Sequence, residues 1–126
     1  MTITQDFFIS ILQLVDDDLL CSIQTSDENL MHAMNQMKNV KIIGWSADII
    51  LSMENKRLLI KHVMSFNTEE RINYFLILKD DKIIFISYDG FEIGTIASSI
   101  TLPDIFISKF VKTGICWVAE NIDIYM

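Results

Sequence analysis

Isoleucine is the residue that most constrains how this chain can fold. The 126 residues include 22 Ile and only 4 Ala. A β-branched side chain is restricted in a helix and packs well on a pleated surface, so this usage favours strands. Hydrophobic residues make up 51% of the chain, which also has one Pro and four Gly. We therefore expect one ordered domain, residues 1–126, in which sheet dominates.

Two helices are predicted in the first third of the chain. Apolar residues recur at helical spacing over residues 4–15, which predicts an amphipathic helix. Thr25 and Glu28 have the spacing of a capping box, and a helix that begins there should end near Asn39. Residues 19–24, between the two helices, form either a short strand or a connection.

From Val40 onward the apolar period changes to two. Short polar connections between consecutive strands imply an antiparallel meander. Residues 46–64 can also be aligned at helical spacing, so a helix there is the alternative. The flanking turn residues and the β-branched content favour strands. The four predicted strands are Trp45–Met53, Arg57–Phe66, Arg71–Lys79 and Lys82–Tyr88.

The last third of the chain completes the predicted sheet. Asp89-Gly90 is a tight-turn signal that leads into a strand over Phe91–Ile96. A Thr-x-x-Asp cap at Thr101 predicts a short helix near residues 101–113. Ile115–Tyr125 then forms one or two strands. The predicted fold class is α+β, a mostly antiparallel sheet with N-terminal helices packed on one face.

The chain is acidic, and its charge is unevenly distributed. The formal net charge is −7, and residues 1–37 contain six acids and no Lys or Arg. Such a field repels nucleic acid and anionic membrane and attracts basic proteins, although acidity can also serve solubility alone. No apolar run reaches the length of a membrane span. Two cysteines without disulfide or zinc spacing favour a cytoplasmic location.

Residues that could carry chemistry are few and scattered. Cys21 and Cys116 have no His at a recognisable spacing, and His32 and His62 are isolated from each other. Adjacent acids in predicted turns are typical of solvated loops. We therefore expect no catalytic residue, no metal ligand and no cofactor, and consider binding the more plausible role.

Two groups of residues are the candidate partner-binding sites. The first is the N-terminal set of acids, whose field no basic residue in that third of the chain dilutes. The second is the segment around the Asp89-Gly90 turn, where acids and aromatic residues combine and the aromatics could anchor a partner. The candidates are Asp16, Asp17, Asp18, Asp27 and Glu28, and Tyr88, Asp89, Phe91 and Glu92.

In size, charge and Ile-rich, Ala-poor composition, the whole chain resembles the small immunity proteins of bacterial contact-dependent growth inhibition and related polymorphic toxin systems. The resemblance implies an antitoxin that binds and blocks a cognate toxin domain, often a nuclease. Carboxylates of the inhibitor would occupy the positions of substrate phosphates. The alternatives are an acidic chaperone for a secreted effector and a small enzyme with an unfamiliar site.

Overall fold

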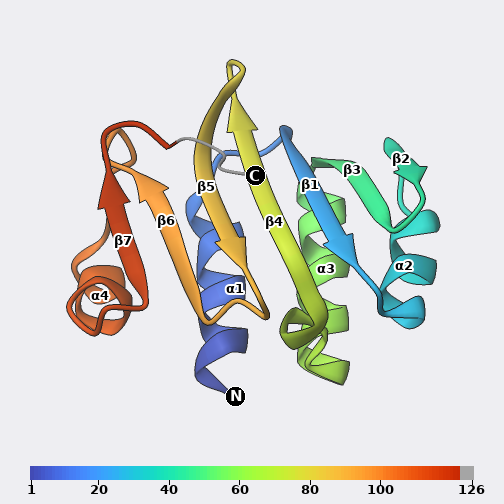
Figure 1. Ribbon diagram of the computed structural model, residues 1–126, viewed down its shortest axis with the longest axis horizontal. Coiled ribbons are helices and arrows are strands. Elements are labelled where there is room, and N and C mark those ends of the chain that lie inside the picture. The colour runs from blue at the N-terminus through green and yellow to red at the C-terminus, as the bar shows by residue number, and fades with distance from the viewer. Residues whose placement is uncertain (123–126) are drawn as a thin grey trace.

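A computed structural model describes residues 1–122, which form a sheet with helices against one face (Figure 1). Seven strands lie in the order β2-β3-β1-β4-β5-β6-β7 within these residues. All neighbouring strands are antiparallel except β6 and β7, which are parallel. The strands are β1 (Leu19–Thr25), β2 (Val40–Ile43), β3 (Ser46–Leu51), β4 (Ile72–Lys79), β5 (Lys82–Tyr88), β6 (Ile93–Ala97) and β7 (Cys116–Ala119).

The predicted α+β class is confirmed, and the order of the strands differs from the prediction. Only β4, β5 and β6 form a meander, because β1 lies between β3 and β4. Cys21 and Ile23 on β1 are fully buried, and a central position gives this apolar strand partners on both sides. Helices contain 38% of the residues and strands 34%, so sheet does not dominate.

The prediction of a strand over Arg57–Phe66 is wrong, because these residues belong to helix α3 (Met53–Phe66). The Ser52 hydroxyl accepts a hydrogen bond from the backbone N–H of Asn55 at 3.1 Å and so caps the first turn. Leu59 and Val63, one helical turn apart, are both fully buried. The helical alternative therefore holds for 53–66, while 46–51 is strand β3.

The ends of the N-terminal helices depend on side-chain caps. Helix α1 (Ile3–Leu14) begins with a capping box between Thr2 and Gln5. Helix α2 (Glu28–Asn35) is capped by Asp27 in place of the predicted Thr25. The Thr25 hydroxyl instead accepts a hydrogen bond from the Asp27 N–H at 3.1 Å. This contact positions Asp27, the residue that caps α2.

Short helices precede two of the later strands of the sheet. A short 3-10 helix, η1 (Thr68–Arg71), leads into β4. Helix α4 (Asp104–Phe106) continues as a π-helix, η2 (Ile107–Val111), and its N-cap is Pro103 and not the predicted Thr101. The predicted strand Ile115–Tyr125 corresponds to β7, with its last three residues outside the described range.

Phenylalanine rings fill the space between the helices and the sheet. Phe7 and Phe8 on α1 lie against Phe75 and Phe85 on the sheet, with Phe91 among them. The ring centroid of Phe91 is 4.9 Å from that of Phe75 and 5.0 Å from that of Phe8. These aromatic contacts add to the hydrophobic stabilisation of a core that α1 and α3 cover from behind the sheet in Figure 1.

The tightest approach to this aromatic core is at Gly94 on β6. A Cβ added there would lie 2.7 Å from the Phe85 ring and 3.0 Å from the Phe7 ring. Gly94→Ala should therefore lower the free energy of unfolding by about 1–3 kcal/mol, as overpacking does. Urea denaturation measures the loss. Thr95→Ala, which removes atoms from the opposite face of the strand, is the control, and an equal or larger loss for the control would contradict the argument.

Candidate functional site

The N-terminal acids are largely paired with lysines from later elements. The Lys79 ammonium on β4 donates to Asp16 Oδ2 at 2.7 Å, and this hydrogen bond holds the pKa of Asp16 below its usual value. The Lys56 ammonium on α3 donates to Asp17 Oδ1 at 2.9 Å. Two of the three consecutive carboxylates are thus neutralised locally.

Lys56 explains why three acids can follow the C-terminus of α1. Its side chain is largely buried, and its ammonium also donates to the carbonyl oxygen of Val15, the C-cap of α1, at 2.6 Å. A cation at this position compensates both the helix dipole and the acids that follow. Asp17 therefore helps to connect α1 with α3, which is a structural role.

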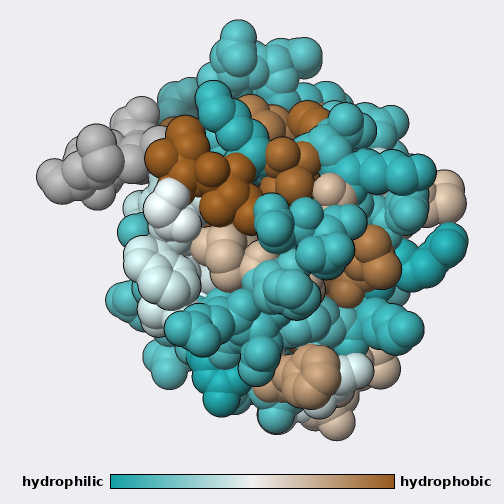
Figure 2. Space-filling model, turned by 90° about the vertical axis from the view of Figure 1, so that its right-hand side faces the viewer, coloured by the Kyte–Doolittle hydropathy of each residue, from teal (hydrophilic) through white to brown (hydrophobic). Residues whose placement is uncertain are grey.

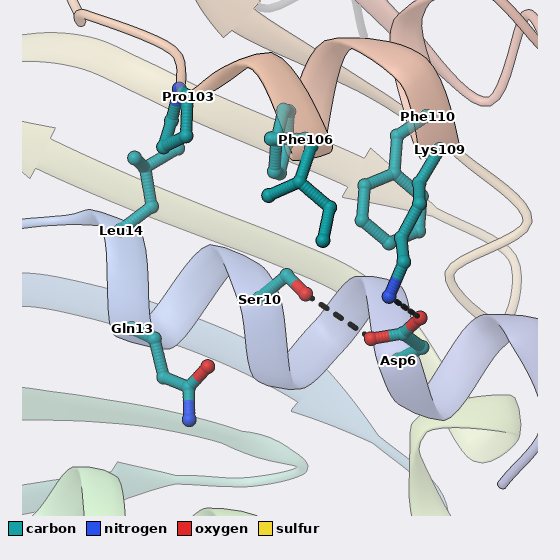
Figure 3. A pocket seen from close by; sticks show the side chains of 9 residues that line it. Asp6, Ser10, Gln13, Leu14, Pro103, Phe106, Lys109 and Phe110 are labelled. Atoms are coloured by element: carbon teal, nitrogen blue, oxygen red, sulfur yellow. Dashed lines mark hydrogen bonds and ion pairs between the residues drawn. The ribbon is translucent and has the colours of Figure 1, made fainter.

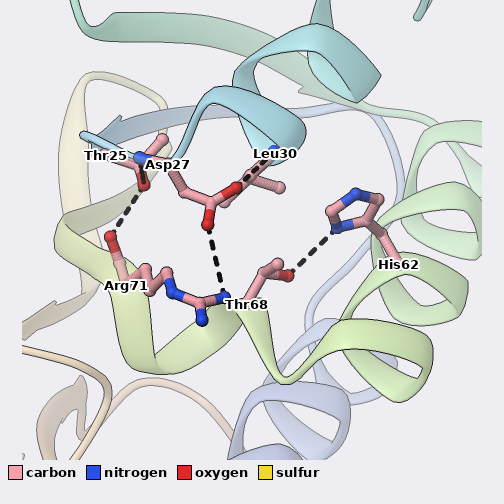
Figure 4. A network of polar contacts seen from close by, with 6 residues as sticks. All are labelled: Thr25, Asp27, Leu30, His62, Thr68 and Arg71. Atoms are coloured by element: carbon pink, nitrogen blue, oxygen red, sulfur yellow. Dashed lines mark hydrogen bonds and ion pairs between the residues drawn. The ribbon is translucent and has the colours of Figure 1, made fainter.

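Asp27 also has a structural role (Figure 4). Its side chain accepts a hydrogen bond from the Leu30 N–H at 2.8 Å and lies 3.3 Å from the Arg71 guanidinium. Near this cluster, Nδ1 of His62 lies 3.1 Å from the Thr68 hydroxyl, and burial lowers the pKa of this histidine. These contacts join α2, α3 and η1. The Asp27 side chain is only 9% exposed.

Asp18 and Glu28 are the exposed members of the first candidate group that make no ion pair within residues 1–122. Asp18 directly precedes β1, and Glu28 follows its other end. A seven-residue strand spans about 20 Å, so these two carboxylates do not form one patch. The structure does not bring the predicted N-terminal acids together as an unpaired surface.

Phe91 is a candidate anchor that, as a strand residue, could equally face inward, and the structure shows that it does: its side chain is 1% exposed. Asp89, Gly90 and Phe91 have φ angles of 48°, 84° and 65°. This left-handed turn is held by a hydrogen bond from the Gly90 N–H to the Ile72 carbonyl at 2.8 Å. The chain therefore turns back under β5, and the Phe91 ring enters the core.

The other residues of the second group lie at one end of the uncovered sheet face. The Tyr88 ring is 42% exposed, and its centroid lies 5.4 Å from that of Tyr74 on the neighbouring strand. Ile93, paired with Tyr88, and Trp117, paired with Thr95, are 56% and 64% exposed. Within residues 1–122 no helix lies over this face, which is turned toward the viewer in Figure 1.

Carboxylates lie around the turn at this end of the sheet, and Glu92 also lines a groove with Ile3 and Thr4 at the start of α1. Asp89 and Glu92 flank the turn, and the Glu70 carbonyl lies 2.9 Å from the position of a Cβ on Gly90, so Glu70 adjoins the same turn. All three side chains are exposed, and none forms an ion pair with another described residue. We name the acidic-aromatic surface as Tyr74, Tyr88, Ile93 and Trp117 with Glu70, Asp89 and Glu92.

A cleft of about 400 Å³ between α1 and α4 is a feature that sequence reasoning missed (Figure 3). Its apolar wall includes Phe106 and Phe110. Asp6, on its rim, accepts hydrogen bonds from Ser10 at 3.2 Å and from Lys109 at 3.1 Å. The charges at the rim are therefore compensated. The 4-residue spacing of Asp6 and Ser10 is visible in sequence, but the contact with Lys109 spans the chain.

The two thiols are buried, and burial raises the pKa of both, to about 11 for Cys116. A thiol with so high a pKa stays protonated at neutral pH, and the thiolate is the nucleophilic form. No group of three His, Cys, Asp or Glu side chains within residues 1–122 has the geometry to hold a metal ion. Within the same residues, no helix is long and apolar enough to cross a membrane.

Glu69 is an unusual buried carboxyl group. It is fully inaccessible to solvent, its Oε2 accepts a hydrogen bond from the Thr4 hydroxyl at 2.8 Å, and its Oε1 has no partner among the described residues. Burial raises its pKa, and the Thr4 hydrogen bond lowers it by a smaller amount. Folding thus makes ionisation of this carboxyl group less favourable than in the unfolded chain, and ionisation at neutral pH costs stability.

Replacement of this carboxyl by an amide should therefore stabilise the fold. Below the ordinary Glu pKa, both the folded and the unfolded chain are protonated at Glu69; as the pH rises past it, the unfolded chain ionises more readily and stability falls. Glu69→Gln removes this loss and keeps an acceptor for Thr4. Its free energy of unfolding should exceed that of the parent at neutral pH, and the difference should shrink toward about pH 4.

Urea denaturation at several pH values measures this effect. Glu70→Gln removes the same charge from the exposed neighbouring residue and is the matched control. A stability difference for Glu69→Gln that is independent of pH, or equal to that of the control, would contradict the assignment.

The chain has no match among protein-family models, curated proteins or solved structures. The candidate site is therefore defined by the geometry of its own residues. The acidic-aromatic surface combines exposed apolar side chains with unpaired carboxylates, whereas the charges at the α1–α4 cleft are compensated. Of the surfaces described, the acidic-aromatic surface has the chemistry best suited to a protein partner.

Proposed function

We propose that this chain is an immunity protein that binds and blocks a cationic toxin domain, and that the acidic-aromatic surface is where the toxin docks. The observation that carries the proposal is the set of large exposed side chains, Tyr88, Ile93 and Trp117, on a sheet face that no described helix covers. Exposed apolar groups rimmed by charged residues are typical of protein interaction sites.

The two kinds of side chain would have different roles in binding. Tyr and Trp bury a large area with few rotatable bonds and are common binding hot spots, so Tyr88 and Trp117 would mainly slow dissociation. The carboxylates of Asp89 and Glu92 lie at the periphery, where charges mainly accelerate association and confer salt dependence.

A nuclease domain is the kind of toxin that best fits these charges. Its active site must hold phosphates and is therefore cationic, and carboxylates of an inhibitor can occupy the phosphate positions. Glu70, Asp89 and Glu92 have no competing ion pair within residues 1–122, so their negative charge remains available to a partner. The resemblance in size and composition to immunity proteins supports the same assignment.

The test uses the protein encoded directly upstream of this chain in its genome, where the proposal expects the toxin domain to be encoded. The unmodified chain should bind that domain and suppress its toxicity in cells. The double variant Asp89→Lys/Glu92→Lys should slow association at low salt by at least about tenfold, and added salt should reduce the difference. Stopped-flow or surface-based kinetics across a salt series measures both effects.

Two further variants separate this surface from the rest of the molecule. Asp18→Lys/Asp81→Lys reverses two exposed charges at the end of the sheet opposite the Asp89-Gly90 turn and changes the net charge equally. It should leave the association rate within about threefold of the parent, because both residues lie away from the docking surface. Trp117→Ala should mainly raise the dissociation rate. An upstream domain that is neither bound nor neutralised would refute the function, and equal effects of Asp18→Lys/Asp81→Lys and Asp89→Lys/Glu92→Lys would refute the location.

A further inference from the structure

The last strand of the sheet has a free edge. β7 pairs with β6 on one side only, and the carbonyls of Ile115 and Ala119 accept hydrogen bonds from Gly94 and Ser98 at 2.9 and 2.8 Å. Backbone groups of alternate residues in a strand point to opposite sides. The N–H and C=O groups of Cys116 and Val118 therefore point toward the edge, where no other strand lies within residues 1–122.

Side chains do not protect this edge. Trp117 and Val118 lie on opposite faces of β7, and both are exposed, at 64% and 45%. The strand contains no charged residue and no proline, the usual devices that keep a free edge from pairing.

The opposite edge of the sheet differs. β2 carries the exposed Lys41 in its middle, and Lys41 lies opposite Asp48 of β3. In the view of this end, hydrophobic residues gather in its upper part and hydrophilic residues surround them (Figure 2). A lysine on an edge strand disfavours addition of another strand. The two edges are therefore not equivalent, and β7 is the one suited to pairing.

Charges on either side of β7 indicate what would pair with it. Lys112 precedes the strand and Glu120 follows it, and both are exposed. Neither makes an ion pair with another described residue. In an antiparallel arrangement of two identical strands, the Glu120 end of each copy lies at the Lys112 end of the other. The edge is thus electrostatically complementary to itself, as an isologous interface must be.

We propose that β7 pairs antiparallel with β7 of a second copy, joining the two seven-stranded sheets across a two-fold axis. Cys116 of each copy faces Val118 of the other, with main-chain hydrogen bonds between them. Trp117 then lies directly opposite Trp117 of the second copy on the uncovered face, where the two rings shield one another from water. Trp117 also belongs to the proposed docking surface, so the dimer would cover part of that surface; the tests below measure self-association without the toxin and do not depend on toxin binding.

The size of the contact sets the strength of the dimer. Two four-residue strands with their side chains form an interface smaller than those of obligate dimers. The dimer therefore exchanges with monomer, and its population rises with protein concentration.

Sedimentation velocity over a wide concentration series tests the proposal. The unmodified chain should shift from monomer to dimer as the concentration rises. Val118→Lys places a charge on the free edge and should weaken dimerisation by at least about tenfold. Ile43→Lys is the control, because Ile43 is also an exposed β-branched residue, at 66%, on the opposite edge and the net charge changes equally. A chain that stays monomeric throughout, or equal effects of the two variants, would overturn the proposal.

Amide hydrogen exchange of the unmodified chain gives a second test that needs no variant. Protection of the Cys116 and Val118 amides should rise with protein concentration, while the Trp117 and Ala119 amides, which face β6, are protected throughout. Protection of Cys116 and Val118 that does not change with concentration would show that these amides are bonded within one chain if it is high, or unpaired throughout if it is low. That result would also overturn the proposal.

Discussion

The structure depends on the position of the Phe91 ring between α1 and the sheet. Asp89 and Phe91 both adopt left-handed backbone conformations, which cost a non-glycine residue about 1–2 kcal/mol each. Full burial of a Phe side chain contributes about 1.5–3 kcal/mol, and each aromatic pair adds about 0.5–1.5 kcal/mol. Phe91 contacts several rings, so burial outweighs the backbone strain. The same turn directs Asp89 outward, so the core positions part of the candidate surface.

The second constraint is that helices cover only one face of the sheet. Leu76 and Ile86 point away from the Phe cluster, yet they are only 7% and 5% exposed. Toward the strand ends and the β7 edge, Tyr88, Ile93 and Trp117 on the same face are exposed. The apolar character needed to keep a two-sided sheet ordered thus also produces the surface available for binding.

Local sequence pattern was sufficient where neighbouring residues determine the structure. Strands β4 and β5 fall within one residue of prediction, because runs rich in Ile and aromatic residues flank the Asp80-Asp81 turn. The missed helix α3 has only one Ile, Ile60, among Met, Glu, Lys, Arg and Leu residues that favour helix. Composition counted over the whole chain obscured this local difference. A count restricted to residues 53–66 would have favoured the helical alternative.

The candidate site could be predicted only in part, because ion pairs depend on residues far apart in sequence. Lys79 is 63 residues from Asp16 and Lys56 is 39 residues from Asp17, so the acid-rich first third of the chain is not an acid-rich region in space. The net charge of −7 is unchanged by such pairing. However, a paired carboxylate acts at a distance as a dipole, whose field decays faster than that of a single charge. Long-range attraction of a cationic partner must therefore come from unpaired acids, and Glu70, Asp89 and Glu92 beside exposed aromatic side chains meet that condition.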